Sequence, residues 1–141
     1  MQTKTFSINI NASKEKVWDV LWNDATYKQW TRVFSEGSYA VTDWQEGSKI
    51  QFLIPSGDGM YSTIARHVPG QVMSFRHIGE VLKGEEQPPK NWAGATETYT
   101  LTESGGTTTL TATMDMAEGE AAYFEQKFPE ALQKVKALAE G

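Results

Sequence analysis

Hydrophobic and polar residues alternate along much of the chain, which predicts β-strands whose two faces meet different environments. In residues 3–11, Phe6, Ile8 and Ile10 share one side and polar residues occupy the other. Six further strands are expected at 37–44, 48–55, 60–68, 71–78, 95–103 and 107–116. Gly- and Pro-containing turns such as 56–59, 69–70 and 104–106 separate several of these segments, so the later strands should form an antiparallel meander.

The last part of the chain, residues 118–140, has a different period. Apolar residues recur there at steps of three and four, which predicts an amphipathic helix. That apolar face contains Ala121, Phe124, Phe128, Ala131, Leu132, Val135, Leu138 and Ala139. Pro129 lacks an N–H group, so we expect a kink near Phe128 or a helix that restarts there. Two shorter helices are predicted after the first strand, at 14–22, with Ser13 as N-cap, and at 25–30.

Residues 80–93 interrupt the alternation. This stretch is polar, contains Pro88 and Pro89, and shows neither helical nor strand periodicity. We predict a long surface loop there, a type of segment that often forms a lid. Trp92 is the large apolar residue near its end that would fold back over an opening.

Composition narrows the function classes. A chain of 141 residues is expected to form one domain, over 1–141, with a sizeable core. The net charge of −5 argues against nonspecific binding to nucleic acid or anionic membranes. No apolar run is long enough to span a bilayer, and the first residues lack a signal-peptide layout, so we expect a cytoplasmic protein. The absence of Cys excludes disulfides and thiolate sites.

Several short motifs carry a resemblance to a known family. They are the run Ile-Asn-Ala-Ser-Lys-Glu-Lys-Val-Trp-Asp-Val-Leu at 10–21, Trp30, Glu46–Gly47, Val68–Pro69–Gly70, Ser74–Phe75–Arg76–His77 and the ending 128–141. On these the chain resembles the START-like (SRPBCC, or birch-pollen-allergen-like) superfamily. Within it, the chain is most similar to the bacterial branch named after the homologue of the activator of the heat-shock chaperone ATPase. These motifs specify a fold and name no chemistry.

The resemblance implies an α+β helix-grip fold. Its curved antiparallel sheet, of seven strands in this sequence, would wrap round the long C-terminal helix, with two short helices after the first strand. It also implies a cavity between sheet and helix that takes a hydrophobic or aromatic molecule in relatives. The alternation in the predicted strands and the period of the predicted helices indicate which residues would face this cavity, and many of these are aromatic or Met. The expected lining residues are Trp30, Phe34, Phe52, Ile54, Phe75, His77, Trp92, Tyr99, Met114, Met116, Phe124, Phe128 and Leu132.

Polar chemistry in this cavity centres on Glu97. A carboxylate on an apolar strand face needs a partner, and Arg66, Arg76 or His77 would be within reach across the sheet. If Glu97 and His77 meet inside, they and Tyr99 are candidates for acid–base catalysis. An exposed Glu97, or a purely structural ion pair, is the plainer interpretation. Two His without a ligand cluster predict no metal site, and no phosphate-binding or dinucleotide motif is present, so no cofactor is expected.

Three functions therefore remain open. The preferred one is binding of a hydrophobic or aromatic small molecule without catalysis. The second is a small-molecule enzyme of the cyclase, dehydratase or hydrolase type in the same cavity. The third is an interaction module like the chaperone activator, which the branch name implies. The sequence leaves the identity of the ligand and the oligomeric state undetermined.

Overall fold

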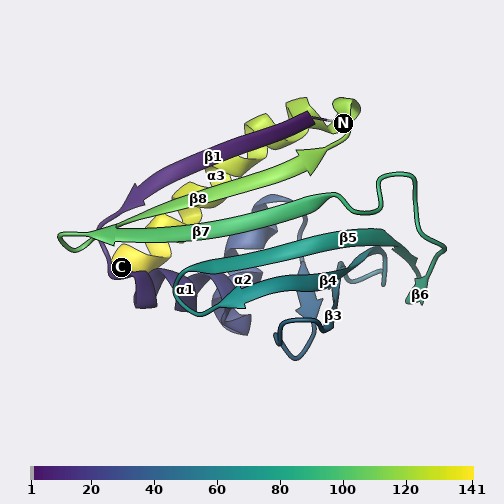
Figure 1. Cartoon of the computed structure of the whole chain (residues 1–141), viewed down its shortest axis with the longest axis horizontal. Helices are drawn as coiled ribbons and strands as arrows, with labels where there is room; N and C mark the ends of the chain where they lie inside the picture. The colour runs from purple at the N-terminus through teal and green to yellow at the C-terminus, as the bar shows by residue number, and fades with distance from the viewer. Residues whose placement is uncertain (1) are drawn as a thin grey trace.

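The fold combines one antiparallel sheet with three α-helices, and the computed structural model describes residues 2–141 (Figure 1). The strands are β1 (Gln2–Ile10), β2 (Tyr39–Val41), β3 (Lys49–Leu53), β4 (Gly59–Val68), β5 (Val72–Leu82), β6 (Glu85–Glu86), β7 (Thr96–Ser104) and β8 (Thr107–Met116). The helices are α1 (Lys14–Trp22), α2 (Asp24–Trp30) and α3 (Ala121–Glu140), with short 3₁₀ turns η1 (Thr31–Val33) and η2 (Glu118–Glu120).

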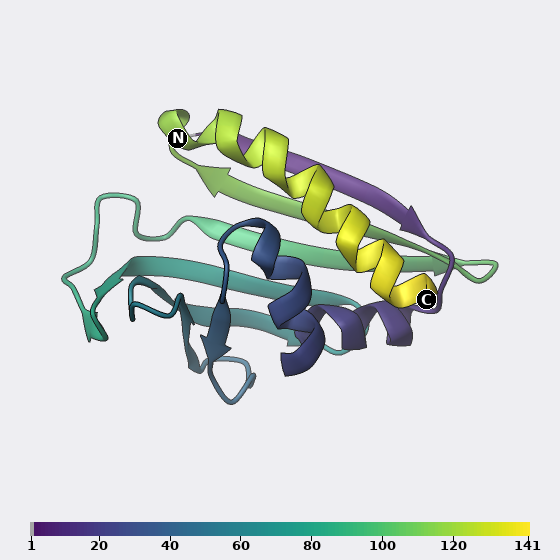
Figure 2. The ribbon, with the colours of Figure 1, turned by 180° about the vertical axis from the view of Figure 1, so that it is seen from behind.

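The sheet has the order β1-β8-β7-β5-β4-β3-β2, and β6 pairs with β5 beside this path. Every pairing is antiparallel. The three helices lie on one face of the sheet, where α3 runs diagonally across it and packs against β1, α1 and α2 (Figure 2). The helix-grip α+β fold expected from the sequence is confirmed, with eight strands in place of seven.

The eighth strand belongs to the segment that was expected to be an irregular surface loop. β5 continues to Leu82, and a tight turn at Lys83 and Gly84, with φ of 50° and 83°, brings β6 back against Val81 and Leu82. Positive φ at both central residues is the geometry of hairpin turns. Beyond β6, backbone N–H groups of Gln87, Lys90 and Gly94 bond to carbonyls of β5. The loop prediction for 80–93 was therefore wrong over its first half.

The pairing of β4 with β5 contains two register shifts, which change the facing of nearby side chains. Ser62 pairs with His77 but Tyr61 pairs with Gly79, so Ile78 is the extra residue in the ladder. A bulge of this kind bends a strand and redirects side chains, and bulges are over-represented next to functional sites. Here it follows directly after His77, and Ser62 is completely buried beside it.

Helix α3 passes through Pro129 without interruption, contrary to the expected restart. Proline removes the N–H that would bond to the carbonyl of Glu125, but Pro129 and Glu125 are both exposed, so water can bind that carbonyl. The opposite face of the helix is buried at Phe128, Ala131 and Leu132, and Phe128 stacks on Phe6 of β1 with ring centroids 5.1 Å apart. The predicted apolar face of the helix thus forms the core with the sheet.

Candidate functional site

A cavity of about 300 Å³ lies between the sheet and the helices, at the end of the molecule where α3 begins. Its size is at the lower end of the range for small-molecule pockets. On the sheet side its walls come from β2, β3, β4, β5, β7 and β8, and on the other side from α1, α2, η1 and α3. The side chains that form the walls are mostly aromatic or aliphatic.

The structure brings together nearly all the residues that the sequence placed in this lining. The following line the cavity: Trp30, Phe34, Phe52, Ile54, Phe75, His77, Trp92, Tyr99, Met114, Met116, Phe124 and Phe128. Glu97 also lines it. Leu132 does not, because it lies further along α3 and is buried in the solid part of the core.

Eleven lining residues escaped the sequence analysis: Trp22, Tyr27, Thr31, Ser38, Tyr39, Leu53, Met60, Ala95, Asp115, Ala117 and Glu120. Trp22 and Tyr27 belong to helices α1 and α2, and local sequence patterns do not predict which face of these helices turns toward the cavity. Ala95, Ala117 and Glu120 flank strands in connections whose course depends on the tertiary fold. Helix period would have placed Tyr27 beside Trp30, three residues away on the same face.

The open end of the cavity is marked by its partly exposed lining residues. Phe34 and Ser38 come from the connection between α2 and β2, Ile54 follows β3, and Trp92 lies in the segment before β7. The backbone around Trp92 is tied down, since Ala95 N–H bonds to the carbonyl of Trp92 at 3.1 Å and Gly94 N–H to that of His77 at 2.9 Å. Trp92 thus stands at the rim on an ordered segment.

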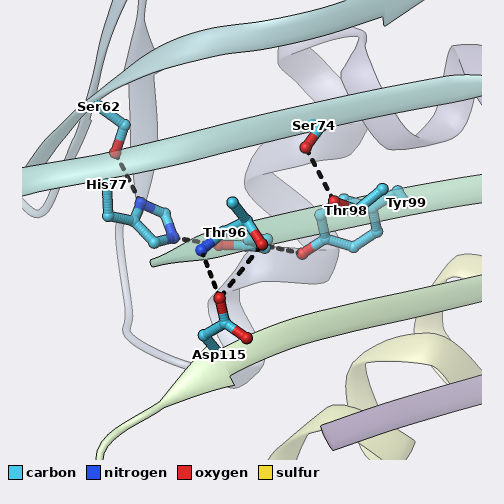
Figure 3. Close-up of polar contacts among 8 residues, drawn as sticks. Ser62, Ser74, His77, Thr96, Thr98, Tyr99 and Asp115 are labelled. Atoms are coloured by element: carbon cyan, nitrogen blue, oxygen red, sulfur yellow. Dashed lines mark hydrogen bonds and ion pairs between the residues drawn. The ribbon is translucent and has the colours of Figure 1, made fainter. Parts of the chain in front are cut away.

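A hydrogen-bonded chain of side chains crosses the sheet wall of the cavity (Figure 3). His77 Nε2 lies 3.1 Å from Glu97 Oε1, and the Tyr99 hydroxyl donates to Glu97 Oε2. On its other side, His77 Nδ1 lies 2.7 Å from Ser62 Oγ. A carboxylate only accepts hydrogen bonds, so His77 Nε2 carries a proton and donates to Glu97, while Nδ1 and the Ser62 hydroxyl share the second hydrogen bond.

Register explains why these groups meet. Glu97 pairs with Phe75 on β5 and with Met114 on β8, so its side chain emerges on the apolar cavity face. His77 is two residues beyond Phe75 on the same strand face, and Tyr99 is two residues beyond Glu97. Arg66 and Arg76, the other partners considered for Glu97, are exposed and take no part.

Two phenols next to Glu97 remain protonated. Burial, and then the negative charge and hydrogen bond of Glu97, raise the pKa of Tyr99 well above its ordinary value. Burial and the charge of Glu97 also raise the pKa of Tyr27 far above its ordinary value. Both side chains are therefore neutral hydroxyl groups near pH 7, able to donate a hydrogen bond.

Asp115 is a second carboxylate near the cavity, but its side chain lies on the opposite face of the sheet from those of Met114 and Met116, beside Thr3 of β1. Its oxygens are occupied. Oδ1 accepts from the Thr3 hydroxyl at 2.7 Å. Oδ2 accepts from the Thr96 N–H at 3.0 Å and from the Thr96 hydroxyl at 3.3 Å (Figure 3). The bonds from Thr3 and from the Thr96 backbone, with smaller contributions from the Thr96 hydroxyl and the nearby His77, lower the pKa of Asp115. This group joins β1, β7 and β8 at the end of the sheet.

Aromatic rings pack around the polar chain. Trp22 contacts Tyr99 and Phe75 edge-on, with centroids 5.1 and 5.6 Å away, and Phe52 contacts Phe75 at 5.1 Å. Within residues 2–141, Trp22 Nε1 is the buried side-chain nitrogen or oxygen atom that has no hydrogen-bond partner. A buried N–H without a partner is costly and therefore notable.

The second histidine has a different environment. His67 stacks on Trp18 with centroids 5.7 Å apart, and its Nδ1 lies 2.6 Å from the carbonyl oxygen of Trp44. Trp18, Trp44 and His67 border a smaller depression on the far side of Trp22. Across residues 2–141, the structure groups no three His, Asp or Glu side chains in a way that could hold a metal ion.

None of the described helices is long and apolar enough to cross a membrane.

A comparison with curated proteins gave no match. Comparison with solved structures gave many matches that show the same fold. One is the Aha1 dimer of Colwellia psychrerythraea, with a TM-score of 0.74 and 21% identity over 99% of this chain and 97% of that one.

Two further structures share the fold. Protein MLL2253 of Mesorhizobium loti has a TM-score of 0.76 and 16% identity, covering 97% of this chain and 96% of that one. CalU16 of Micromonospora echinospora has a TM-score of 0.69 and 16% identity, covering 97% of this chain and 75% of that one. Identities this low establish a common architecture and leave the chemistry open.

The family comparison agrees with the fold and spans nearly the whole chain. The profile that matches residues 11–140 is described as "Activator of Hsp90 ATPase homolog 1-like protein". The chain therefore belongs to the family of activator of Hsp90 ATPase homolog 1-like proteins, within the START-like proteins of helix-grip fold.

Proposed function

We propose that this protein binds a hydrophobic or aromatic small molecule in the cavity between the sheet and α3. The observation that carries the proposal is an open, mostly apolar cavity of about 300 Å³ with a few polar groups converging at one wall. Ligand sites in proteins have this composition, because apolar walls supply affinity and a few polar groups fix orientation. The proposed ligand is small, with up to about three rings, since the cavity is small.

The proposed residues divide into two roles. Phe75 and Phe128 are buried and supply apolar contact area deep in the site, Phe52 adds area at a half-buried position, and Trp92 and Phe34 stand at the rim. Tyr99 and Glu97 meet a polar group of the ligand. The cytoplasmic location belongs to the same proposal.

A titration with N-phenyl-1-naphthylamine tests this function. This neutral aromatic probe fluoresces strongly in apolar surroundings, and saturable binding with one site per chain is the expected result. Ala95 lines the cavity and is buried, so Ala95→Phe should fill the space and abolish binding. Ala93→Phe is the matched control, because Ala93 is exposed and outside the lining. Equal binding by both variants would contradict the proposal, provided that circular dichroism shows both folded.

Catalysis in the same cavity is a second candidate, because the structure does join His77, Glu97 and Tyr99. The geometry provides an oriented chain in which Ser62 fixes His77, and His77 and Tyr99 both donate to Glu97. Such a chain can move a proton to or from a ligand that contacts it. Conversion of a bound compound that is lost in Glu97→Gln but retained in Ser62→Ala would support this second function.

The interaction function suggested by the family description has less support. In residues 2–141, the exposed large hydrophobic side chains are Val41, Leu82 and Tyr123, and these belong to β2, β5 and α3. A docking surface normally gathers such residues into one patch. We therefore place this function behind the two cavity-based ones.

A further inference from the structure

The charged groups around the cavity are almost all of one sign. Glu97 and Glu120 line it, and His77 is the single basic side chain among the described lining residues, with no Lys or Arg. His77 is hydrogen-bonded at both ring nitrogens, to Glu97 and to Ser62, so neither nitrogen is left for a ligand. The cavity is thus an electronegative site in a protein of net charge −5.

Glu97 has acceptor capacity left over on this wall. A carboxylate offers about four acceptor positions, and the structure fills two, one on each oxygen, with His77 and Tyr99. Its side chain is 21% exposed, whereas that of His77 is only 9% exposed. Since Glu97 is a lining residue, its remaining acceptor positions are available to a donor within the cavity.

Aromatic rings pack around Tyr99, the residue that donates to this carboxylate. Tyr99 hydrogen-bonds to it, and Trp22 and Trp30 contact Tyr99 with ring centroids 5.1 and 6.2 Å away. Tyr27 packs against Trp30 at 5.6 Å. Aromatic faces attract cations, Trp most strongly, and the effect grows where water is displaced.

These three observations specify the charge of the ligand. An anionic ligand, such as a fatty acid, would bring its carboxylate to a cavity lined by two carboxylates, Glu97 and Glu120, and by no Lys or Arg among the described residues. Like charges in a partly desolvated site repel, which is a known means of rejecting a ligand. A cation instead meets a counter-charge and aromatic faces at once.

We propose, on the basis of the binding function above, that the cavity prefers organic cations: small aromatic or alicyclic compounds that carry a protonated amine. Glu97 is the counter-charge, and Trp22, Trp30 and Tyr99 enclose the ammonium group. The apolar body of the ligand then lies toward Phe75 and Phe128. Neutral compounds with a hydroxyl donor bind more weakly, and carboxylates bind weakest.

Three probes with one skeleton test the proposal by displacement of N-phenyl-1-naphthylamine at neutral pH. They are 1-naphthaleneethylamine, a cation; 1-naphthaleneethanol, which is neutral; and 1-naphthaleneacetate, an anion. The expected order of affinity is amine, alcohol, acetate, with the amine at least about tenfold tighter than the alcohol, as for a charge-assisted hydrogen bond. An acetate that binds as tightly as the amine would overturn the proposal.

Glu97→Gln then identifies the residue responsible. It removes the charge but keeps an oxygen that accepts a hydrogen bond, so amine affinity should fall about tenfold while alcohol affinity changes less than threefold. Glu130→Gln is the matched control, because it makes the same change of net charge at an exposed position on α3 outside the lining. The role of Glu97 would be refuted if Glu97→Gln left the ratio of amine affinity to alcohol affinity unchanged. It would also be refuted if Glu130→Gln lowered this ratio by the same factor.

The outcome separates this inference from the binding function on which it rests. If N-phenyl-1-naphthylamine fails to bind the wild-type protein, the binding function itself fails. If that probe and the naphthalene alcohol bind and Ala95→Phe blocks both, the binding function holds. If the protein then binds the amine no more tightly than the alcohol, only the proposed preference for cations is overturned. The wild-type order of the three probes is decisive even if Glu97→Gln does not fold.

Discussion

The hydrogen bond from Tyr99 to Glu97 gives the most specific prediction about stability. Tyr99 is 2% exposed, and its hydroxyl is the donor that satisfies one oxygen of a partly buried carboxylate. Tyr99→Phe leaves the ring packing intact and removes this charge-assisted bond, so we expect a loss of about 1.5–3 kcal/mol in the free energy of unfolding. For a chain of this length the melting temperature should fall by roughly 5–9 °C.

Tyr27→Phe is the matched control for Tyr99→Phe. Tyr27 is also buried, at 6% exposure, and lines the same cavity, but among the described residues no hydrogen bond holds its hydroxyl, whose pKa is affected only by burial and by the charge of Glu97. Its removal should cost less than about 1 kcal/mol. Thermal unfolding followed by circular dichroism measures both variants. A melting temperature of Tyr99→Phe equal to that of Tyr27→Phe would refute the energetic role of the Glu97 bond.

Three other predictions concern pH and the last helix. Because the pKa of Tyr99 is raised in the folded state, the unfolded chain releases a proton above about pH 10 that the folded chain keeps. The free energy of unfolding in urea should therefore fall with pH between about pH 10 and 11. It should fall less steeply in Tyr99→Phe. The lowered pKa of Asp115 has the opposite sign: its contribution is present above about pH 4 and disappears as pH falls through the lower folded value. Asp115→Asn should therefore lose less stability than the wild type between pH 5 and 2, as acid titrations followed by fluorescence will show. Pro129→Ala restores the N–H that faces the carbonyl of Glu125 and should raise the free energy of unfolding in urea by about 1–2 kcal/mol; an unchanged value would mean that hydration already compensates.

Periodicity was enough to predict most of the architecture. The alternation in residues 3–11 placed Phe6, Ile8 and Ile10 on the core side, and the burial along β1 follows that alternation. The apolar face of 118–140 likewise became the buried face of α3, at Phe128 and Leu132 among others. These local patterns are reliable because one face of each element is buried along its whole length.

Local rules failed where tertiary contacts decide the conformation. The turn that creates β6 has Lys83 at φ 50°, a position where Asn or Asp is the usual signal, and backbone bonds to β5 then hold the following residues. The extra residue Ile78 in β5 leaves no mark in the sequence, yet it follows directly after His77. Pro129 was given too much weight, because its side of the helix faces solvent.

The composition of the site was partly predictable for the same physical reasons. Strand parity put Phe75 and His77 on one face, and Glu97 and Tyr99 on the facing strand, so their meeting followed from antiparallel pairing in register. What parity could not give was the position of Ser62 behind His77, which depends on a register shift. It also could not give the lining from Trp22 and Tyr27, which depends on how α1 and α2 lie over the sheet.

The tryptophan side chains allow the most direct test that the cavity is the ligand site. Trp30 and Trp92 line the cavity, whereas Trp18 borders the separate depression near His67. In a ¹H–¹⁵N correlation spectrum titrated with N-phenyl-1-naphthylamine, the indole signals of Trp30 and Trp92 should shift in a saturable manner while that of Trp18 stays in place. Ligand binding in the cavity would be contradicted if a saturating concentration of the probe shifted the Trp18 signal alone or shifted none of the indole signals.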